Sequence, residues 1–211
     1  MLGTAAFRRL ELAVGPGVFV PRPETELVAE RAMESLPRAG TLVDLCCGSG
    51  AIALSVADER PDARVLATEL SPAAARWAAE NRRALGLEVE LLVGDLFEPL
   101  PAELRGAVDV VVANPPFVDE AERATLPRDV VEHEPPGALF APGSGTSVIE
   151  RIVAEAPTWL RPDGWLVLEI GETQAARVST FLAAAGFDDV AIRADLNGRD
   201  RIAEGRWTSP R

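Results

Sequence analysis

Short apolar runs alternate with amphipathic stretches along most of the chain. The runs are rich in Val, Leu and Ile, which is typical of strands buried on both faces of a parallel sheet. We predict such strands at 41–45, 65–68, 89–93, 108–113 and 165–170. Apolar residues at helical spacing predict helices at 51–59, 72–85, 146–160 and 173–185. Strand alternating with helix implies right-handed crossovers and therefore an α/β, doubly wound, mostly parallel sheet.

Both ends of the chain depart from this alternation. Near the N-terminus, 7–14 and 18–20 flank Gly15-Pro16-Gly17, which predicts a β-hairpin turning at these glycines. A helix should follow from Glu24 to Leu36, opened by acidic residues that suit a helix N-terminus. Near the C-terminus, 190–193 and 201–207 flank a polar turn and predict an antiparallel hairpin.

No linker divides the sequence, so we expect one domain over 1–211. It would comprise an N-terminal hairpin and helix in 1–40 and a doubly wound core in 41–211. The segment from Asp119 to Gly145 is rich in Pro, Gly and charge, and we expect it to form a loop or lid over a site.

The strand at 108–113 ends in Asn114-Pro115-Pro116-Phe117. The Asn114 side chain and the Pro115 main chain each offer a carbonyl that can accept an N–H group, and Phe117 offers a flat aromatic face. These groups predict a clamp for a planar nitrogen with two N–H bonds, such as an amide or an exocyclic base amine. The same residues also fit an ordinary turn, because Asn-Pro and Pro-Pro are common loop signals.

A nucleoside-cofactor site is predicted where the first three buried strands end. The loop from Asp44 to Gly50 joins a strand to a helix, so its glycines permit close approach and the helix offers free N–H groups. Glu69 ends the second strand, where its carboxylate can accept both ribose hydroxyls. Asp95, between Gly94 and Leu96, follows the third strand and can accept an adenine amino group.

This loop fits two cofactors. Gly48-x-Gly50-x-x-Ala53, followed by an acid at the end of the next strand, matches a dinucleotide fingerprint as well as a methyltransferase. The clamp and the antiparallel final hairpin favour S-adenosylmethionine over NAD. A dehydrogenase would also need an acid or base beside its hydride acceptor, and no obvious candidate is present.

Composition excludes several classes of protein. The net charge of −12 argues against a large nucleic-acid footprint, since phosphate binding needs clustered cations. Adjacent Cys46 and Cys47 rarely bridge and cannot complete a zinc site, so we expect a reducing compartment and no metal. The one histidine, His133, is expected to be a solvated loop residue. Without a leader or an apolar run of spanning length, we expect a cytoplasmic protein with no membrane partner.

Beyond the clamp and the cofactor loop, the chain carries three further boxes: Phe19-Val20-Pro21-Arg22-Pro23-Glu24-Thr25-Glu26, Glu134-Pro135 and Glu169-Ile170-Gly171. With these, it resembles the HemK/PrmC family, the glutamine N5-methyltransferases that modify peptide release factors. The resemblance runs from Leu2 to Trp207 and includes Asn81, Gln174, Asp195, Gly198 and Arg201. It implies a class I methyltransferase with a Rossmann-like sheet, which uses S-adenosyl-L-methionine, releases S-adenosyl-L-homocysteine and needs no metal.

The resemblance also implies the site residues. Those expected to bind the cofactor are Phe19, Thr25, Asp44, Cys46, Cys47, Gly48, Ser49, Gly50, Glu69, Asp95, Leu96 and Asn114. Those expected to hold the substrate amide are Asn114, Pro115, Pro116 and Phe117. Accepting both N–H bonds of an amide localises electron density on its nitrogen and aims it at the sulfonium methyl group, so no strong base is required.

Three departures from the family pattern bear on the substrate. Phe117 stands where release-factor enzymes usually have Tyr. Cys46 replaces the first glycine of the cofactor loop, which is tolerable if its φ is negative. The family's N-terminal helical domain is missing, which indicates a truncated chain or a shorter paralogue.

We therefore expect methyl transfer to a protein glutamine, in the Gly-Gly-Gln motif of a peptide chain release factor. A stand-alone N-methyltransferase of a small-molecule or peptide amide or amine is an alternative. Methylation of an exocyclic amine of a nucleic-acid base is a further one, which the negative charge disfavours. A non-catalytic cofactor-binding module is the last.

Overall fold

A seven-stranded sheet in the order β5-β4-β3-β6-β7-β9-β8 forms the centre of the computed structural model, which describes residues 3–208. Its strands are β3 (Thr41–Leu45), β4 (Arg64–Glu69), β5 (Glu90–Val93), β6 (Val108–Ala113), β7 (Leu160–Glu169), β8 (Phe187–Ala194) and β9 (Asp200–Trp207). Strands β3 to β7 run parallel, and β9 pairs antiparallel with both β7 and β8. The predicted doubly wound sheet and final hairpin are confirmed. Residues 1–2 and 209–211 of the expected domain, including Leu2, lie outside the described residues.

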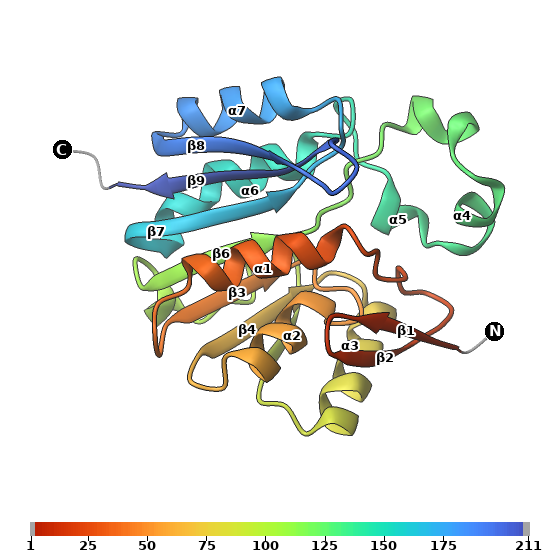
Figure 1. The fold of residues 1–211 in the computed structure, drawn as a ribbon, viewed down its shortest axis with the longest axis horizontal. Helices are drawn as coiled ribbons and strands as arrows, with labels where there is room; N and C mark the ends of the chain where they lie inside the picture. The colour runs from red at the N-terminus through yellow and green to blue at the C-terminus, as the bar shows by residue number, and fades with distance from the viewer. Residues whose placement is uncertain (1–2, 209–211) are drawn as a thin grey trace.

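Helices cover both faces of the sheet (Figure 1). On one face lie α1 (Thr25–Ser35), α2 (Ala51–Glu59) and α3 (Pro72–Leu85), and on the other α6 (Ser147–Trp159) and α7 (Ala175–Ala184). Side chains alternate across each strand, so Val110 and Val112 pack toward α1 and α2 while Val111 and Ala113 pack toward α6 and α7. Both faces are therefore buried, which explains the uninterrupted apolar runs.

The N-terminal hairpin was predicted with the wrong turn. β1 (Gly3–Phe7) pairs with β2 (Leu10–Val14) across Arg8 and Arg9, and residues 18–20 form no strand. Arg8 adopts a left-handed φ of 51°, and its side chain donates to both carboxylate oxygens of Glu59 on α2. This distant anchor fixes a turn that carries none of the usual turn residues. The chain after Gly17 instead runs irregularly toward α1.

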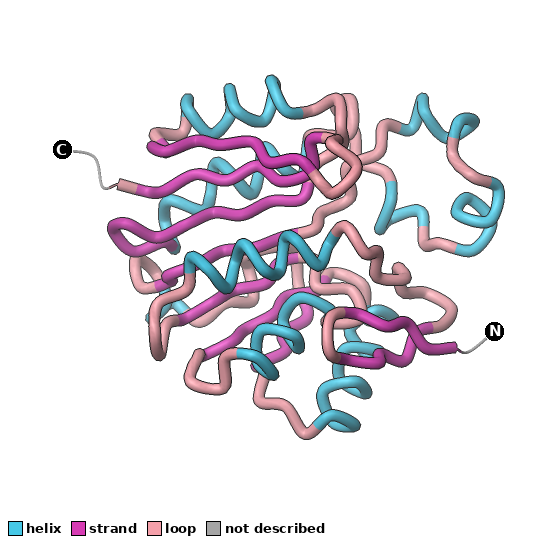
Figure 2. Tube along the Cα trace, in the orientation of Figure 1, coloured by secondary structure: helices cyan, strands magenta, loops and turns pink. Residues whose placement is uncertain are grey.

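The segment expected to be a loop contains short helices. A 3₁₀ turn (Glu120–Thr125), α4 (Arg128–His133) and α5 (Pro136–Leu139) follow one another between β6 and α6. A second 3₁₀ turn (Ala102–Leu104) precedes β6. Figures 1 and 2 show the α4–α5 segment projecting beyond the carboxyl ends of the parallel strands. No helix within residues 3–208 is long and apolar enough to cross a membrane.

The sheet order reverses between β3 and β6. Their following helices, α2 and α6, therefore cover opposite faces and leave a crevice at the carboxyl ends of the two strands. Open α/β sheets bind ligands at such a switch point.

Candidate active site

A cleft of about 710 Å³ opens at this switch point. Its walls come from the β3–α2 loop, the ends of β4, β6 and β7, the segment before α1, and α5. Every residue expected at the site lines the cleft except Gly50. Gly50 instead precedes α2 with a φ of 85°, and a Cβ there would approach Leu54 Cδ1 to 2.9 Å. Glycine is required at this position by the backbone and by close packing.

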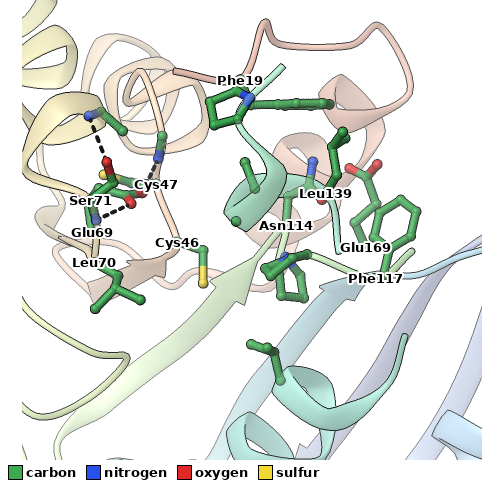
Figure 3. A pocket seen from close by; sticks show the side chains of 18 of the residues that line it. Phe19, Cys46, Cys47, Glu69, Leu70, Ser71, Asn114, Phe117, Leu139 and Glu169 are labelled. Atoms are coloured by element: carbon green, nitrogen blue, oxygen red, sulfur yellow. Dashed lines mark hydrogen bonds between the residues drawn. The ribbon is translucent and has the colours of Figure 1, made fainter. Parts of the chain in front are cut away.

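The carboxylate of Glu69 ties two loops of the cleft together (Figure 3). One oxygen accepts the Gly48 N–H at 2.8 Å, and the other accepts the Ser71 N–H at 2.8 Å. Each oxygen keeps a second lone pair that can accept a ligand hydroxyl. The carboxylate is thus fixed in direction at the end of β4.

Cys46 does not have the negative φ under which a cysteine was expected to be tolerated here. Its φ is 58°, so a side chain occupies a left-handed position that favours glycine. The Cys46 side chain is half-buried against the α6 face of the core and lines the cleft. Burial raises the pKa of its thiol well above the ordinary range, with nearby Glu69 and Asp44 adding to the effect. The thiol is therefore held in its neutral form.

Asp44 is buried beneath the same loop. Its Oδ2 accepts the Ala53 N–H at 3.0 Å, whereas its Oδ1 has no hydrogen-bond partner among residues 3–208. Burial, opposed by the Ala53 hydrogen bond, raises the pKa of Asp44 to about 8, and the negative charge of Glu69 adds to this. An orphaned acceptor in a cleft wall marks a place for a donor from a ligand.

The third expected acid lies farther along the same wall. Asp95 Oδ2 accepts from Arg151 Nη2 at 2.7 Å, so one oxygen is engaged by a guanidinium from α6. Leu96 beside it has a left-handed φ of 47° and is buried. This sharp turn after β5 brings Leu96 to the cleft.

The clamp at the end of β6 is held from behind by Gln174. Its Nε2 donates to the Phe117 carbonyl at 2.8 Å, and its Oε1 accepts the Gly171 N–H at 2.9 Å. Gly145 packs against the same carbonyl so closely that a Cβ would lie 2.1 Å from the Phe117 oxygen. The backbone of the clamp is therefore fixed by contacts from two other segments.

The side chain of Asn114 is fixed by a hydrogen-bond chain. Asn114 Nδ2 donates to Thr25 Oγ1 at 3.1 Å, and Thr25 Oγ1 donates to Glu169 Oε2 at 2.7 Å. Figure 3 shows Asn114, Phe117 and Glu169 grouped on the side of the cleft opposite Glu69 and Ser71. Burial raises the pKa of Glu169 to about 7, although the hydroxyl of Thr25 and the charge of Arg201 oppose the increase.

The α4–α5 segment is attached to the chain before α1 by Glu134. One carboxylate oxygen accepts from Arg22 Nη2 at 2.6 Å, and the other accepts the Val20 N–H at 3.2 Å. Burial raises the pKa of Glu134, although the charge of Arg22 and the Val20 hydrogen bond oppose the increase. The Arg22 guanidinium also lies 4.9 Å from the centre of the Phe19 ring. Glu134 thus connects two walls of the cleft.

Several cleft residues were not among those expected at the site from the sequence. They are Arg151 and Arg201, which bring positive charge, and Leu70, Leu139 and Phe140, which bring apolar surface. Arg201 was noted in the family resemblance, and Glu169 in its third box, but their spacing gives no sign of what they contact. Conversely, His133 is exposed and is not among the residues that line the cleft.

Comparisons with known proteins agree with this geometry. The model of the methyltransferase small domain family matches residues 10–135. A release factor glutamine methyltransferase of Mycolicibacterium smegmatis is 50% identical over 205 residues, covering 96% of this chain and 72% of the relative. The chain belongs to the release factor glutamine methyltransferase family. The family expected from its boxes is thereby confirmed.

Solved structures extend the likeness to the fold. A release-factor-specific protein-(glutamine-N5) methyltransferase from Alicyclobacillus acidocaldarius is 28% identical, with a TM-score of 0.56 over 92% of this chain and 98% of that one. The 16S rRNA N2 G1207 methyltransferase of T. thermophilus, solved with AdoMet and guanosine, is 22% identical with a TM-score of 0.71. It covers 98% of this chain and 50% of that one, and at this identity it supports the fold alone.

Proposed function

We propose that this member of the family transfers a methyl group from S-adenosylmethionine to the side-chain amide of a glutamine in the Gly-Gly-Gln motif of a peptide chain release factor. The observation that carries the proposal is the meeting of two features in one cleft. A carboxylate-lined loop suited to a nucleoside cofactor faces a clamp suited to an amide nitrogen. The chain that holds them is 50% identical to a release factor glutamine methyltransferase.

The residues present fit S-adenosylmethionine. When Asp44 is ionised, its orphaned Oδ1 can accept from an ammonium group, whose positive charge would oppose the effect of burial on the Asp44 pKa. The fixed carboxylate of Glu69 is an acceptor for ribose hydroxyls. Asp95 and the main chain of Leu96 would contact the adenine, and Phe19 would line the methionine end of the cofactor. When bound, this cofactor supplies an electrophilic methyl group. No metal is assigned, and the described residues hold no cluster of three His, Cys, Asp or Glu side chains that could bind one.

The clamp activates a weak nucleophile by orientation. The lone pair of an amide nitrogen is delocalised into its carbonyl group, so the nitrogen attacks poorly. Asn114 Oδ1 and the Pro115 carbonyl each accept one N–H, which draws electron density onto nitrogen and fixes its direction. Phe117 provides the face on which the planar amide lies. Proton loss can follow methyl transfer, so the site needs no strong base.

The macromolecular partner is proposed to be the release factor itself. A net charge of −12 disfavours direct binding to nucleic acid, because such binding needs clustered cations. Arg22, Arg151 and Arg201 nevertheless bring positive charge to the cleft wall. Arg22 and Arg151 are engaged by Glu134 and Asp95, and Arg201 donates to the Ile170 carbonyl. A carbonyl or carboxylate group of an entering peptide loop would share these guanidinium groups with those partners.

The test is transfer of labelled methyl from S-adenosylmethionine to an intact release factor, beside the same factor with its Gly-Gly-Gln glutamine changed to alanine. We expect label on the glutamine form alone. Label on both forms would place the modification elsewhere. No label on either, with cofactor binding measured by calorimetry on the same sample, would exclude the release factor and leave a smaller amide as substrate.

A further inference from the structure

We propose that Glu169 and Thr25 are positioning residues that turn the Asn114 side chain so that its oxygen, and not its nitrogen, faces the substrate. This inference rests on the proposed function, because it concerns how the clamp accepts an N–H group. It assigns the hydroxyl of Thr25 to the clamp rather than to the cofactor. It also assigns a role to Glu169 of the Glu-Ile-Gly box, which is not part of the cofactor loop.

The three residues come from distant parts of the sequence and meet in the core. Thr25 begins α1, Asn114 follows β6, and Glu169 ends β7. Both Thr25 and Glu169 are only 4% exposed, so water does not compete freely for their hydrogen bonds. Within residues 3–208, Asn114 Oδ1 accepts no hydrogen bond, and Asn114 lines the cleft.

The donor and acceptor in each hydrogen bond of the Asn114–Thr25–Glu169 series are fixed by which groups carry protons. An ionised Glu169 can only accept, so the single proton of the Thr25 hydroxyl must point to it. The oxygen of Thr25 then has only lone pairs left for Asn114. Asn114 must therefore present its NH₂ group to Thr25, which leaves Oδ1 on the other side. One buried negative charge thus dictates which end of an amide faces the cleft.

Protonation of Glu169 reverses this logic. A neutral carboxyl can donate to Thr25, whose proton is then free to point at Asn114. The side-chain amide of Asn114 then rotates, so that its carbonyl oxygen accepts from Thr25 and its NH₂ group faces the cleft. An NH₂ group at this position is a donor, whereas the N–H bonds of the substrate need an acceptor. The clamp can then no longer bind the substrate amide.

Other charges near Glu169 determine the pH at which it is protonated. Arg201 on β9 favours the ionised form, and Glu24, which precedes α1, opposes it. Burial is the largest influence, and it raises the pKa of Glu169 to about 7. A change of Asn114 orientation with pH should therefore be visible near neutrality.

The first measurement needs neither substrate nor cofactor. In ¹⁵N-labelled protein, the Asn114 side-chain amide signals are followed by NMR from pH 5 to 9, assigned by their loss in Asn114→Ala. We expect them to move with a midpoint of about 7, and to stop moving in Glu169→Gln and in Thr25→Val. Glu204→Gln is the matched control, because Glu204 is also buried but binds Arg31 and Arg193 away from the cleft. In Glu204→Gln, the Asn114 side-chain amide signals should titrate as they do in the parent protein.

Kinetics supply the second measurement. Thr25→Val should lower kcat about 10- to 100-fold with little change in the cofactor Kd, and Thr25→Ser should recover most of the loss. Glu169→Gln should lower kcat and remove the acid limb of its pH profile. The Glu204→Gln control should keep that limb.

The outcomes separate this inference from the proposed function. A parent protein that methylates the release factor but shows static Asn114 signals and an active Thr25→Val overturns the inference alone. Titrating Asn114 signals in a protein that does not methylate the release factor overturn the proposed function alone. A cofactor Kd that weakens as much as kcat falls in Thr25→Val would return Thr25 to the cofactor site, against the inference.

Discussion

Three buried carboxylates surround the cleft, and each is held by a different kind of partner. Asp44 accepts a backbone N–H, Glu134 accepts from a guanidinium and a backbone N–H, and Glu169 accepts a hydroxyl. Burial raises the pKa of all three. For Asp44 and Glu169 the pKa is moved to about 8 and about 7, where ligands and solvent conditions can change the charge of the side chain.

At the residue scale, we expect Asp44→Asn to alter the pH dependence of stability. The pKa of Asp44 is raised from 3.8 to about 8 on folding, so the folded state holds a proton that the unfolded state releases. Its contribution is present below pH 4 and is lost as the pH rises toward 8. Without ligand, the free energy of unfolding should therefore fall between pH 5 and 8.5.

Urea unfolding at both pH values measures this effect. Asp44→Asn should remove roughly 3 to 5 kcal/mol of the decrease. The remaining slope should include the contribution of Glu169, whose pKa burial raises to about 7. Equal slopes in the parent and the variant would show that Asp44 is not kept neutral by burial.

A second residue-scale prediction concerns the clamp. Asn114→Ala removes the side-chain acceptor, and we expect kcat to fall about 10²- to 10³-fold, the range seen when one preorganised polar group is lost. The cofactor Kd, measured by calorimetry, should change less than about threefold. Equal losses of turnover and cofactor binding would contradict the clamp.

At the scale of elements, the clamp depends on segments that never touch substrate. The loop before α6 brings Gly145 against the Phe117 carbonyl, and Gln174 before α7 donates to the same oxygen. These contacts fix a backbone that has left the sheet after β6. Strand β6 positions the clamp, and the segments that precede α6 and α7 hold its backbone rigid.

This arrangement predicts unequal effects for two neighbouring glycines. Gly143 and Gly145 both have left-handed φ values, 65° and 74°, but a Cβ on Gly143 would meet nothing closer than 3.7 Å. Gly143→Ala should cost only the backbone strain, about 1 kcal/mol. Gly145→Ala should cost at least about 2 kcal/mol more and lower kcat at least about tenfold, because Phe117 must move. Thermal unfolding and kinetics compare the pair, and similar effects would mean that the clamp tolerates displacement.

The elements that were predicted correctly are those with local signals. The predicted bounds of β3, β6, α2 and α3 match the structure because apolar runs and helical spacing mark them in the sequence. In the structure, Ser71 caps the start of α3 and Gly86 follows its end. The N-terminal turn was wrong because Arg8 and Arg9 carry no turn signal, and their conformation is fixed by Glu59 and Glu26. The same limit applies to the site. Its residues could be named from strand ends, but the pairing of Thr25 with Glu169 spans 144 positions and has no local pattern.

At the scale of the whole molecule, the projecting α4–α5 segment is attached to the body at few points. Glu134 binds Arg22 and Val20, while a single β-bridge joins Val118 to Phe140. Most residues of α4 are exposed. The order of this segment should therefore depend on the Glu134 contacts more than on its own packing.

We expect Glu134→Ala to speed amide hydrogen exchange across 128–139 by about tenfold, corresponding to ~1.4 kcal/mol of lost local stability. Glu132→Ala is the matched control, because Glu132 lies on α4 two residues before Glu134 and pairs only with exposed Arg128. Mass spectrometry of the exchanged peptides reads out both variants. Equal exchange in the two would show that Glu134 does not hold the segment.

The position of β9 in the sheet determines the order in which the protein can be completed on the ribosome. β9 lies between β7 and β8, so β8, although synthesised earlier, has no partner in the sheet until residues 200–207 have emerged. The same strand delivers Glu204 to Arg31 of α1 and Arg201 to the cleft. A nascent chain stopped before β9 therefore holds a cofactor loop and a clamp, but an unsealed sheet edge and an incomplete cleft wall. Assembly of the sheet edge and of this cleft wall therefore depends on the same strand.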